Sequence, residues 1–139
     1  MNYKIIGKYI KNLEFSIPNP KVFFLLSKNI ANYKINIDIK SNQIEKDIIE
    51  VILTLSLTPT KDNFEKINTK IEFSTIVQLT KDEIAKNEIE KIVLIHVPSE
   101  VYSGLRKIFI SLFESSGFKD VKINENIDFQ KLYSENRIQ

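Results

Sequence analysis

Residues 33–39 have the sequence YKINIDI, and this stretch sets the expectation for the fold. Apolar residues stand at positions 33, 35, 37 and 39, and each is followed by a polar residue. Successive side chains of a β-strand point to opposite faces, so this alternation of β-branched and polar residues predicts a strand with one buried face. A single strand is not stable alone in water, and the pattern therefore requires partner strands.

Partner strands are expected at residues 9–17, 48–58 and 64–79, with turns at residues 18–20, 41–43 and 59–63. The connections between neighbouring strands favour an antiparallel sheet. The residues expected to share one face of their strand are Tyr9, Lys11, Leu13, Phe15 and Ile17 in the first stretch, Val51, Leu53, Leu55 and Leu57 in the second, and Ile71, Phe73, Thr75, Val77 and Leu79 in the third.

The hydrophobic period changes from two to that of a helix after Leu79. Thr80 and Glu83 have the spacing of a capping box, which predicts a helix start at this point. Pro98 is expected to break or kink the helix, and Gly117 to cap its end. A last short helix is expected to begin near Asp128. The apolar helical face comprises Ile84, Ile89, Ile92, Val93, Val101, Leu105, Ile108, Phe109, Leu112 and Phe113.

The order of these elements predicts one α+β domain over residues 1–139. We expect a four-stranded antiparallel sheet with a long broken helix and a short C-terminal helix on one face. Val22 to Leu26, with the sequence VFFLL, is expected to lie in a loop after the first strand. Five consecutive apolar residues in a loop either fold back as core or wall a binding groove.

Composition excludes several classes of function. The chain has 139 residues, no cysteine, and 20 basic against 18 acidic side chains that intermingle along the sequence. Disulfides and thiolate metal sites are therefore absent, and the lack of clustered arginine argues against a nucleic-acid partner. Residues 1–15 lack the apolar region of a signal peptide, and no apolar run reaches the length of a membrane span. We expect a cytoplasmic protein without direct membrane insertion.

Residues suited to catalysis are scarce. His96 is the single histidine, and the three glycines Gly7, Gly104 and Gly117 are isolated, so that no phosphate-binding loop can form. A packed or hydrogen-bonded role for His96 is favoured over a metal or catalytic role, because the sequence suggests no partner ligands for it. We expect no catalytic residues, no metal and no cofactor.

Several stretches resemble the SecB family of protein-export chaperones. Residues 9–19 are similar to the family's opening strand and its proline-containing crossover, and residues 34–57 fit its paired strands. Val97-Pro98, Tyr102, Arg106, Ser116-Gly117-Phe118 and residues 126–133 (NIDFQKLY) follow the family's spacing without a gap. The resemblance covers most of the chain, and its specificity lies in the joint spacing.

The resemblance implies an ATP-independent holdase that binds unfolded client polypeptides in apolar grooves and assembles as a homotetramer, a dimer of dimers. The implied peptide-binding residues are Leu13, Phe15, Val22, Phe23, Phe24, Tyr33, Ile35, Ile37, Phe129, Leu132 and Tyr133. The implied subunit-interface residues are Thr69, Ile71, Phe73, Thr75, Val77, Tyr102, Leu105 and Phe109.

The family's acidic docking face for the SecA translocation ATPase is only partly matched. The positions that correspond to it are Asn12, Glu14, Ser16, Lys70 and Glu72, where three side chains are not acidic. This departure argues against SecA docking but not against client holding. Two alternatives to a general export chaperone stay open: a SecB-like chaperone dedicated to one client such as an antitoxin, and a structural or adaptor module that fills its groove with its own residues 22–26.

Overall fold

The structure of the chain is a computed structural model that describes residues 2–60, 67–119, 121 and 123–138, with side chains through residue 135. The elements in chain order are β1 (Tyr3–Ser16), α1 (Pro20–Asn29), η1 (Ile30–Asn32), β2 (Tyr33–Glu45), β3 (Ile48–Pro59), β4 (Asn68–Leu79), α2 (Lys86–Lys91), η2 (Ile92–His96), α3 (Val97–Ser115) and α4 (Phe129–Ile138).

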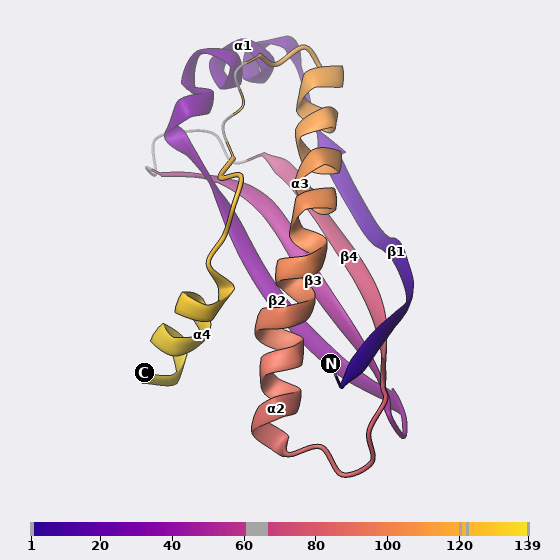
Figure 1. Cartoon of the computed structure of the whole chain (residues 1–139). Helices are drawn as coiled ribbons and strands as arrows, with labels where there is room; N and C mark the ends of the chain where they lie inside the picture. The colour runs from indigo at the N-terminus through magenta and orange to yellow at the C-terminus, as the bar shows by residue number, and fades with distance from the viewer. Residues whose placement is uncertain (1, 61–66, 120, 122, 139) are drawn as a thin grey trace.

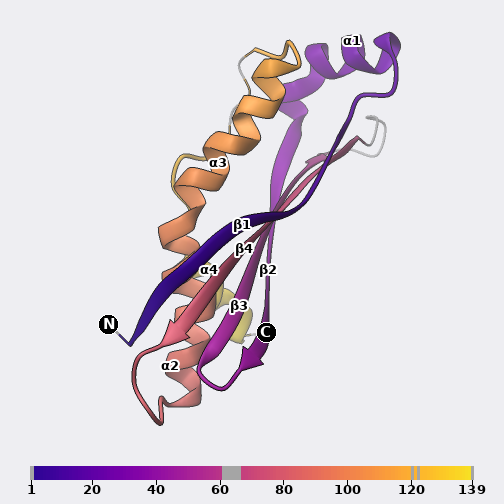
Figure 2. The same cartoon turned by 90° about the vertical axis from the view of Figure 1, so that its right-hand side faces the viewer.

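The four strands form one antiparallel sheet in the order β1-β4-β3-β2, which leaves β1 and β2 as its edges. The helices α2 and α3 run along one face of this sheet, and α4 lies beside β2 (Figure 1). No described helix covers the opposite face (Figure 2). The prediction of a four-stranded antiparallel sheet with a long and a shorter helix is confirmed.

The core lies between the sheet and α3. Cross-strand pairs such as Leu55–Ile71 and Leu53–Phe73 place their side chains on the same face. Phe109 and Phe113 of α3 are fully buried against this layer. Burying an aliphatic or aromatic side chain of this size contributes about 1.5–3 kcal/mol, so the layer between sheet and helix is the main source of stability.

The long helix is continuous through Pro98, because a π-helical turn (η2) precedes the proline. Proline has no N–H, and its ring collides with the carbonyl group four residues earlier, which the wider π turn accommodates. The predicted break or kink at Pro98 thus corresponds to a π-helical interruption just before the proline, and the helix does not end there. The capping-box prediction is wrong: the helix begins at Lys86 after Ala85, and Glu83 adopts a positive φ of 55° in the preceding loop.

Gly117 ends α3 as predicted, with a φ of 92° that L-residues rarely adopt. The N–H of Phe118 donates to the carbonyl of Phe113 at 3.0 Å, and the N–H of Gly117 donates to that of Glu114 at 3.1 Å. These two bonds form a Schellman motif, and the rings of Phe113 and Phe118 supply its apolar contact at 5.9 Å.

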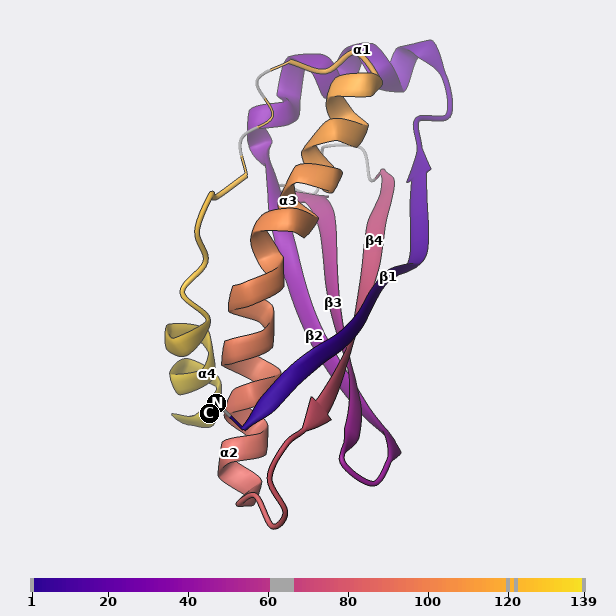
Figure 3. The same ribbon diagram turned by 45° about the vertical axis from the view of Figure 1, so that its right-hand side comes forward.

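The segment 22–26 is helical and not a loop, which corrects the expectation from the sequence. The side chain of Asn19 accepts a hydrogen bond from the N–H of Val22 at 2.9 Å, and Pro20 occupies the first helical turn. Both features are start signals of a helix, because the asparagine satisfies a free N–H and the proline has none to satisfy. The helix α1 crosses the end of the sheet (Figure 3).

The first strand begins at Tyr3, earlier than predicted, and has irregular register between Ile5 and Gly7 and between Ile10 and Asn12. Each bulge inserts a residue and reverses the faces that follow. Tyr9 and Lys11 therefore reach the outer face of the sheet, whereas Phe15 packs on Phe113 of α3, so the expected common face of residues 9–17 is wrong.

The start of the fourth strand at Phe64 and part of the turn at 59–63 lie outside the described residues; the described strand begins at Asn68. Within the described part of the chain, no helix is both long enough and apolar enough to cross a membrane.

Candidate peptide groove

A groove follows the edge strand β2 on its helix-covered side, and we refer to it as the β2 groove. Its middle section has a volume of about 560 Å³. A second section lies toward the start of α4 and shares Ile37 and Leu132 with the middle section. A third section lies toward α2 and shares Glu90 and Leu94 with it. The three sections together run from Ile35 to Ser41 of β2, roughly 20 Å at the rise of a strand.

The floor of the β2 groove consists of Ile35, Ile37 and Ile39, which are half-buried. They alternate with the exposed Lys34, Asn36, Asp38 and Lys40 because β2 is a strand with one face on the core. Their cross-strand partners Leu57, Leu55 and Leu53 are buried, so the floor is the rim of the core and not an isolated patch.

The wall of the groove opposite β2 is formed by α4. Leu132 is 38% exposed and faces the groove, whereas Phe129 and Tyr133 are buried and hold the helix in place. The ring of Phe129 lies 5.9 Å from that of Tyr102, and the hydroxyl of Tyr133 donates to Glu90 at 3.1 Å. Asp128 caps α4 by accepting from the N–H of Lys131 at 2.9 Å, in agreement with the predicted helix start.

The linker, which we define as residues 123–128, joins α4 to the preceding chain and is fastened to α3. The hydroxyl of Tyr102 donates to the carbonyl of Asn124 at 2.6 Å, and Nε of Arg106 donates to the carbonyl of Ile123 at 3.1 Å. Burial of the Tyr102 ring raises the pKa of its hydroxyl, against a smaller opposing effect of Arg106. The phenol therefore stays protonated and available as a donor at neutral pH.

Charged residues along the groove are mainly acidic. These charged side chains lie around the groove, and none of them belongs to its apolar floor. The acidic residues are Asp38, Glu90, Asp128 and Glu135, and the basic residues are Lys86 and Lys131.

The structure divides the sequence-predicted peptide-binding residues into two groups. The first group belongs to the β2 groove or to its supports. The second gathers around α1 and the end of β1, and none of its members lines the β2 groove. The first group is Tyr33, Ile35, Ile37, Phe129, Leu132 and Tyr133, and the second is Leu13, Phe15, Val22, Phe23 and Phe24.

The second group is exposed only in part. Phe24 is 68% exposed and Leu13 is 45% exposed. Val22 is buried, and Phe23 packs on Phe118 with ring centroids 4.9 Å apart. Phe24 therefore has the apolar surface of α1 that a partner can reach most easily.

Six apolar residues that line the groove were not assigned to it from the sequence: Ile39, Ile84, Ile89, Val93, Leu94 and Ile127. Ile84, Ile89 and Val93 were expected only as part of an apolar helical face. Ile39 has the same parity as Ile35 and Ile37, so the alternation already contained its signal. The sequence contained no such signal for Leu94 or Ile127, because Leu94 lies in the π-helical turn and Ile127 lies in a linker without a hydrophobic period.

Most predicted subunit-interface residues are buried within the single chain. Ile71, Thr75, Val77, Leu105 and Phe109 lie in the core between sheet and α3. Thr69 and Tyr102 are buried as well, and Phe73 is half-buried. Contact with a second copy would therefore need other atoms. Four of the exposed apolar side chains lie on the edge strand β1: Ile6, Tyr9, Ile10 and Leu13.

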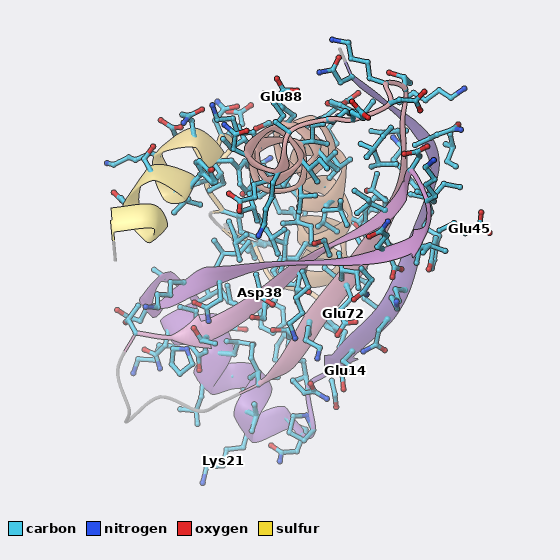
Figure 4. The ribbon with its side chains drawn as sticks, turned by 90° about the horizontal axis from the view of Figure 1, so that it is seen from below. Glu14, Lys21, Asp38, Glu45, Glu72 and Glu88 are labelled. Atoms are coloured by element: carbon cyan, nitrogen blue, oxygen red, sulfur yellow. The ribbon has the colours of Figure 1, made fainter. Side chains whose placement is uncertain are left out.

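The outer face of the sheet carries a three-residue charge cluster. Lys70 lies 3.4 Å from Glu14 and 3.2 Å from Glu72, and these carboxylates, first Glu72 and then Glu14, raise its pKa. Glu14 and Glu72 are neighbours on the side turned away from α2 and α3 (Figure 4). The exposed Asn12 and Ser16 add no charge, so this face is not an acidic surface.

A buried carboxylate, Glu50, lies on the same outer face. It accepts hydrogen bonds from Ser74 at 2.7 Å and from Lys11 and Tyr9 at 3.0 Å. Donation by Ser74, followed by Lys11, lowers the pKa of Glu50 to about 2. Asn42 of β2 also donates to Glu50, at 3.3 Å, so the group joins all four strands. Its geometry is structural, because the acceptor capacity of the carboxylate is already used.

Among the residues described, no group of three or more His, Asp or Glu side chains could hold a metal ion. His96 is exposed and stacks on Tyr3 with ring centroids 6.5 Å apart.

Comparison with known proteins gives consistent relatives. The family model described as "Preprotein translocase subunit SecB" matches residues 1–139. A "Putative protein-export protein SecB" of Pelagibacter ubique is 35% identical over 134 residues, covering 96% of each chain. A "Protein-export protein SecB" of Anaplasma phagocytophilum is 25% identical and covers 94% of this chain and 89% of its own.

A solved structure has the same fold. It is a SecB-like chaperone of Mycobacterium tuberculosis in complex with a peptide from an antitoxin. The TM-score is 0.66 at 10% identity, over 91% of this chain and 88% of that one.

Proposed function

The chain belongs to the SecB family of protein-export chaperones, and from this premise we propose that it holds unfolded polypeptides in the β2 groove without hydrolysing a nucleotide. The observation that carries the proposal is the alternation of Ile35, Ile37 and Ile39 along the floor of the groove. An extended polypeptide also presents a side chain to one face at every second residue, so its spacing matches that of the floor.

Holding in this groove is reversible on energetic grounds. Each apolar side chain of the client that is buried contributes about 1.5–3 kcal/mol, but an unfolded chain loses conformational entropy when it is ordered. A groove of about 20 Å accommodates few such side chains on its floor. Release therefore needs no energy source, in keeping with a chain whose three glycines form no phosphate loop.

We propose assembly as a homotetramer in the cytoplasm. Four apolar side chains of the edge strand β1, 44–49% exposed, support self-association: Ile6, Tyr9, Ile10 and Leu13. Static light scattering on the purified chain measures the mass; a monomer at micromolar concentration would contradict this part of the proposal.

The second candidate function is that of a chaperone dedicated to one client, such as an antitoxin. The charge cluster on the outer face favours it, because Lys70 between Glu14 and Glu72 makes that surface a poor partner for a protein that docks on acidic groups. Binding of purified SecA to the chain, measured by calorimetry, separates the two candidates: micromolar or tighter binding supports an export chaperone.

The holdase proposal is tested with an unfolded probe, reduced and carboxamidomethylated α-lactalbumin, in the absence of ATP. Ile37→Ser and Leu132→Ser change the floor and the wall of the groove and are expected to weaken binding about 5- to 20-fold each, as loss of a large apolar contact. Ile44→Ser is the matched control, since Ile44 is 54% exposed on the same strand and outside the groove. If the wild-type chain does not bind the probe, the holdase proposal is wrong. If Ile44→Ser weakens binding as much as the groove variants do, the groove is not the binding site.

A further inference from the structure

Two side chains on neighbouring turns of α3 hold the linker, and both do so through its backbone. Tyr102 donates to the carbonyl of Asn124 at 2.6 Å, and Arg106 donates to the carbonyl of Ile123 at 3.1 Å. Residues four apart lie on the same side of a helix, so both donors point to one stretch of the linker. Consecutive carbonyl groups of the linker are thereby fixed to α3, the longest described helix.

The fastened stretch continues directly into the wall of the β2 groove. Asn124, Ile127 and Asp128 line its section nearest the linker, together with Lys131 and Leu132 of α4. Ile123 is 5% exposed and Phe129 is 2% exposed, so the stretch is anchored by an apolar side chain at each end. The ring of Tyr102 touches the second of these anchors, 5.9 Å from Phe129.

We infer that Tyr102 and Arg106 are positioning residues for client binding: they set the distance between the α4 wall and the β2 floor without touching the client themselves. The inference rests on the proposed function of the groove. Neither residue is among those that line the sections of the groove, so their effect passes through the backbone of the linker. A loosened linker would let α4 move away from β2 and shorten the lifetime of the complex.

The bonds can be removed singly. Tyr102→Phe deletes the hydroxyl and keeps the ring on Phe129, and Arg106→Met deletes the donor and keeps most of the stem. Each is expected to weaken binding of reduced and carboxamidomethylated α-lactalbumin about 5- to 10-fold, mainly through faster dissociation, as the loss of one hydrogen bond implies. Arg106→Lys restores a donor of similar reach and is expected to recover at least half of the loss in affinity on a logarithmic scale.

Matched controls exist on the same chain. Tyr9→Phe removes a phenol hydroxyl whose partner, Glu50, lies on the outer face, and Lys107→Met removes an exposed positive charge next to Arg106. Both are expected to leave affinity unchanged within twofold.

A spectroscopic measurement distinguishes positioning from a general loss of stability. The chain has no cysteine, so Gln130→Cys provides a single attachment point for a nitroxide spin label at an exposed position of α4 that does not line the groove. The label is expected to become more mobile in Tyr102→Phe and Arg106→Met, and to keep its wild-type line shape in both controls.

The outcomes are separable. Weaker binding with a more mobile label and rescue by lysine support the inference. If the wild-type chain binds the probe and both Tyr102→Phe and Arg106→Met bind it with the same affinity, the inference is wrong and the proposed function stands. Equal losses in variants and controls, in proportion to lowered melting temperatures, also overturn the inference. A wild-type chain that does not bind the probe overturns the proposed function, and the inference with it.

Discussion

At the scale of single residues, folding lowers the pKa of the Glu50 carboxyl to about 2. The side chain is buried, and its hydrogen bonds from Ser74, Lys11, Asn42 and Tyr9 all favour the ionised form. A carboxylate with a lowered pKa stabilises the folded state above its ordinary pKa, and this contribution is lost as the pH falls toward the folded value. The affected window runs from about pH 5 down to about 2, since the pKa falls from 4.5 to about 2.

Glu50→Gln is therefore expected to lower the free energy of unfolding at pH 7 by about 1–3 kcal/mol, less than the full pKa shift implies because Lys11 is partly exposed. Urea denaturation measured at pH 7, 5 and 3 should show the difference from wild type shrinking as the pH falls. Glu45→Gln, at an exposed position of β2, is the control and should leave the free energy of unfolding unchanged at all three pH values. A constant difference across the three pH values would contradict the assigned cause.

Phe23 and Phe24 are adjacent residues with different surroundings. Phe24 is 68% exposed, while Phe23 packs on Phe118 and approaches Gly117. Phe23→Ser is expected to cost about 2 kcal/mol of stability, and Phe24→Ser less than about 0.5 kcal/mol. Thermal and urea unfolding measure both. Equal, large losses would favour the adaptor alternative, in which residues 22–26 serve only as core.

At the scale of elements, the strands and the start of α4 were predictable, and the starts of α1 and α2 were not. The strand at 33–39 follows from its own alternation, because the residues that face the core are visible in the sequence. Segment 22–26 was misread because Asn19 and Pro20 are signals of both a turn and a helix start, and the packing of Val22 and Leu26 decides between them. Gly7 marks the first bulge of β1, but no glycine or proline marks the second, between Ile10 and Asn12, so the faces of Tyr9 and Lys11 could not be assigned.

The candidate site was predictable to the same extent. Ile35, Ile37 and Leu132, which a hydrophobic period marked in the sequence, line the β2 groove, and their role in peptide binding stays a prediction. The residues around α1 were grouped with them because the sequence contains no distance between α1 and α4. Tyr102 and Arg106 donate hydrogen bonds to backbone carbonyl groups of the linker, and no pattern of side chains in the sequence predicts such bonds.

Two glycines, Gly104 inside α3 and Gly117 just after its end, permit a test of the helix cap. Gly117 has a φ of 92°, and a Cβ there would lie 3.4 Å from the ring of Phe23, whereas a Cβ at Gly104 would meet nothing within 4 Å. Gly117→Ala is expected to cost about 1–2 kcal/mol, and Gly104→Ala to stabilise by about 0.5–1 kcal/mol. Urea unfolding measures both signs. Stabilisation by Gly117→Ala would show that the α3 cap does not need the left-handed residue.

At the scale of the whole molecule, the two faces of the sheet have separate roles in the proposed function. The helix-covered side supplies the apolar groove for clients. The outer side carries charged and hydrogen-bonded groups, with Glu50 bonded to Ser74 of the neighbouring strand and Lys70 between the carboxylates of Glu14 and Glu72. A partner protein on the outer face and a client in the groove therefore do not compete for the same surface.

Charge is distributed unevenly over this molecule. The whole chain has a formal net charge of +2, yet the groove carries more acidic than basic residues. Because field strength at a client depends on nearby charges, the groove should favour apolar segments flanked by lysine or arginine over the same segments flanked by glutamate. Two synthetic peptides that differ only in these flanks are expected to differ about 3- to 10-fold in affinity at low salt, with the difference falling at 1 M salt as screening increases.

Asp38→Asn tests the origin of that preference, since Asp38 is exposed beside the middle section of the groove. The substitution should reduce the ratio of the two affinities without altering the contribution of the apolar floor, which Ile37→Ser removes. Glu45→Gln lowers the negative charge of the same strand by the same amount outside the groove, and it should leave the ratio unchanged. Equal effects of the two variants would mean that the preference follows the net charge of the molecule, and the groove would then select clients by apolar spacing alone.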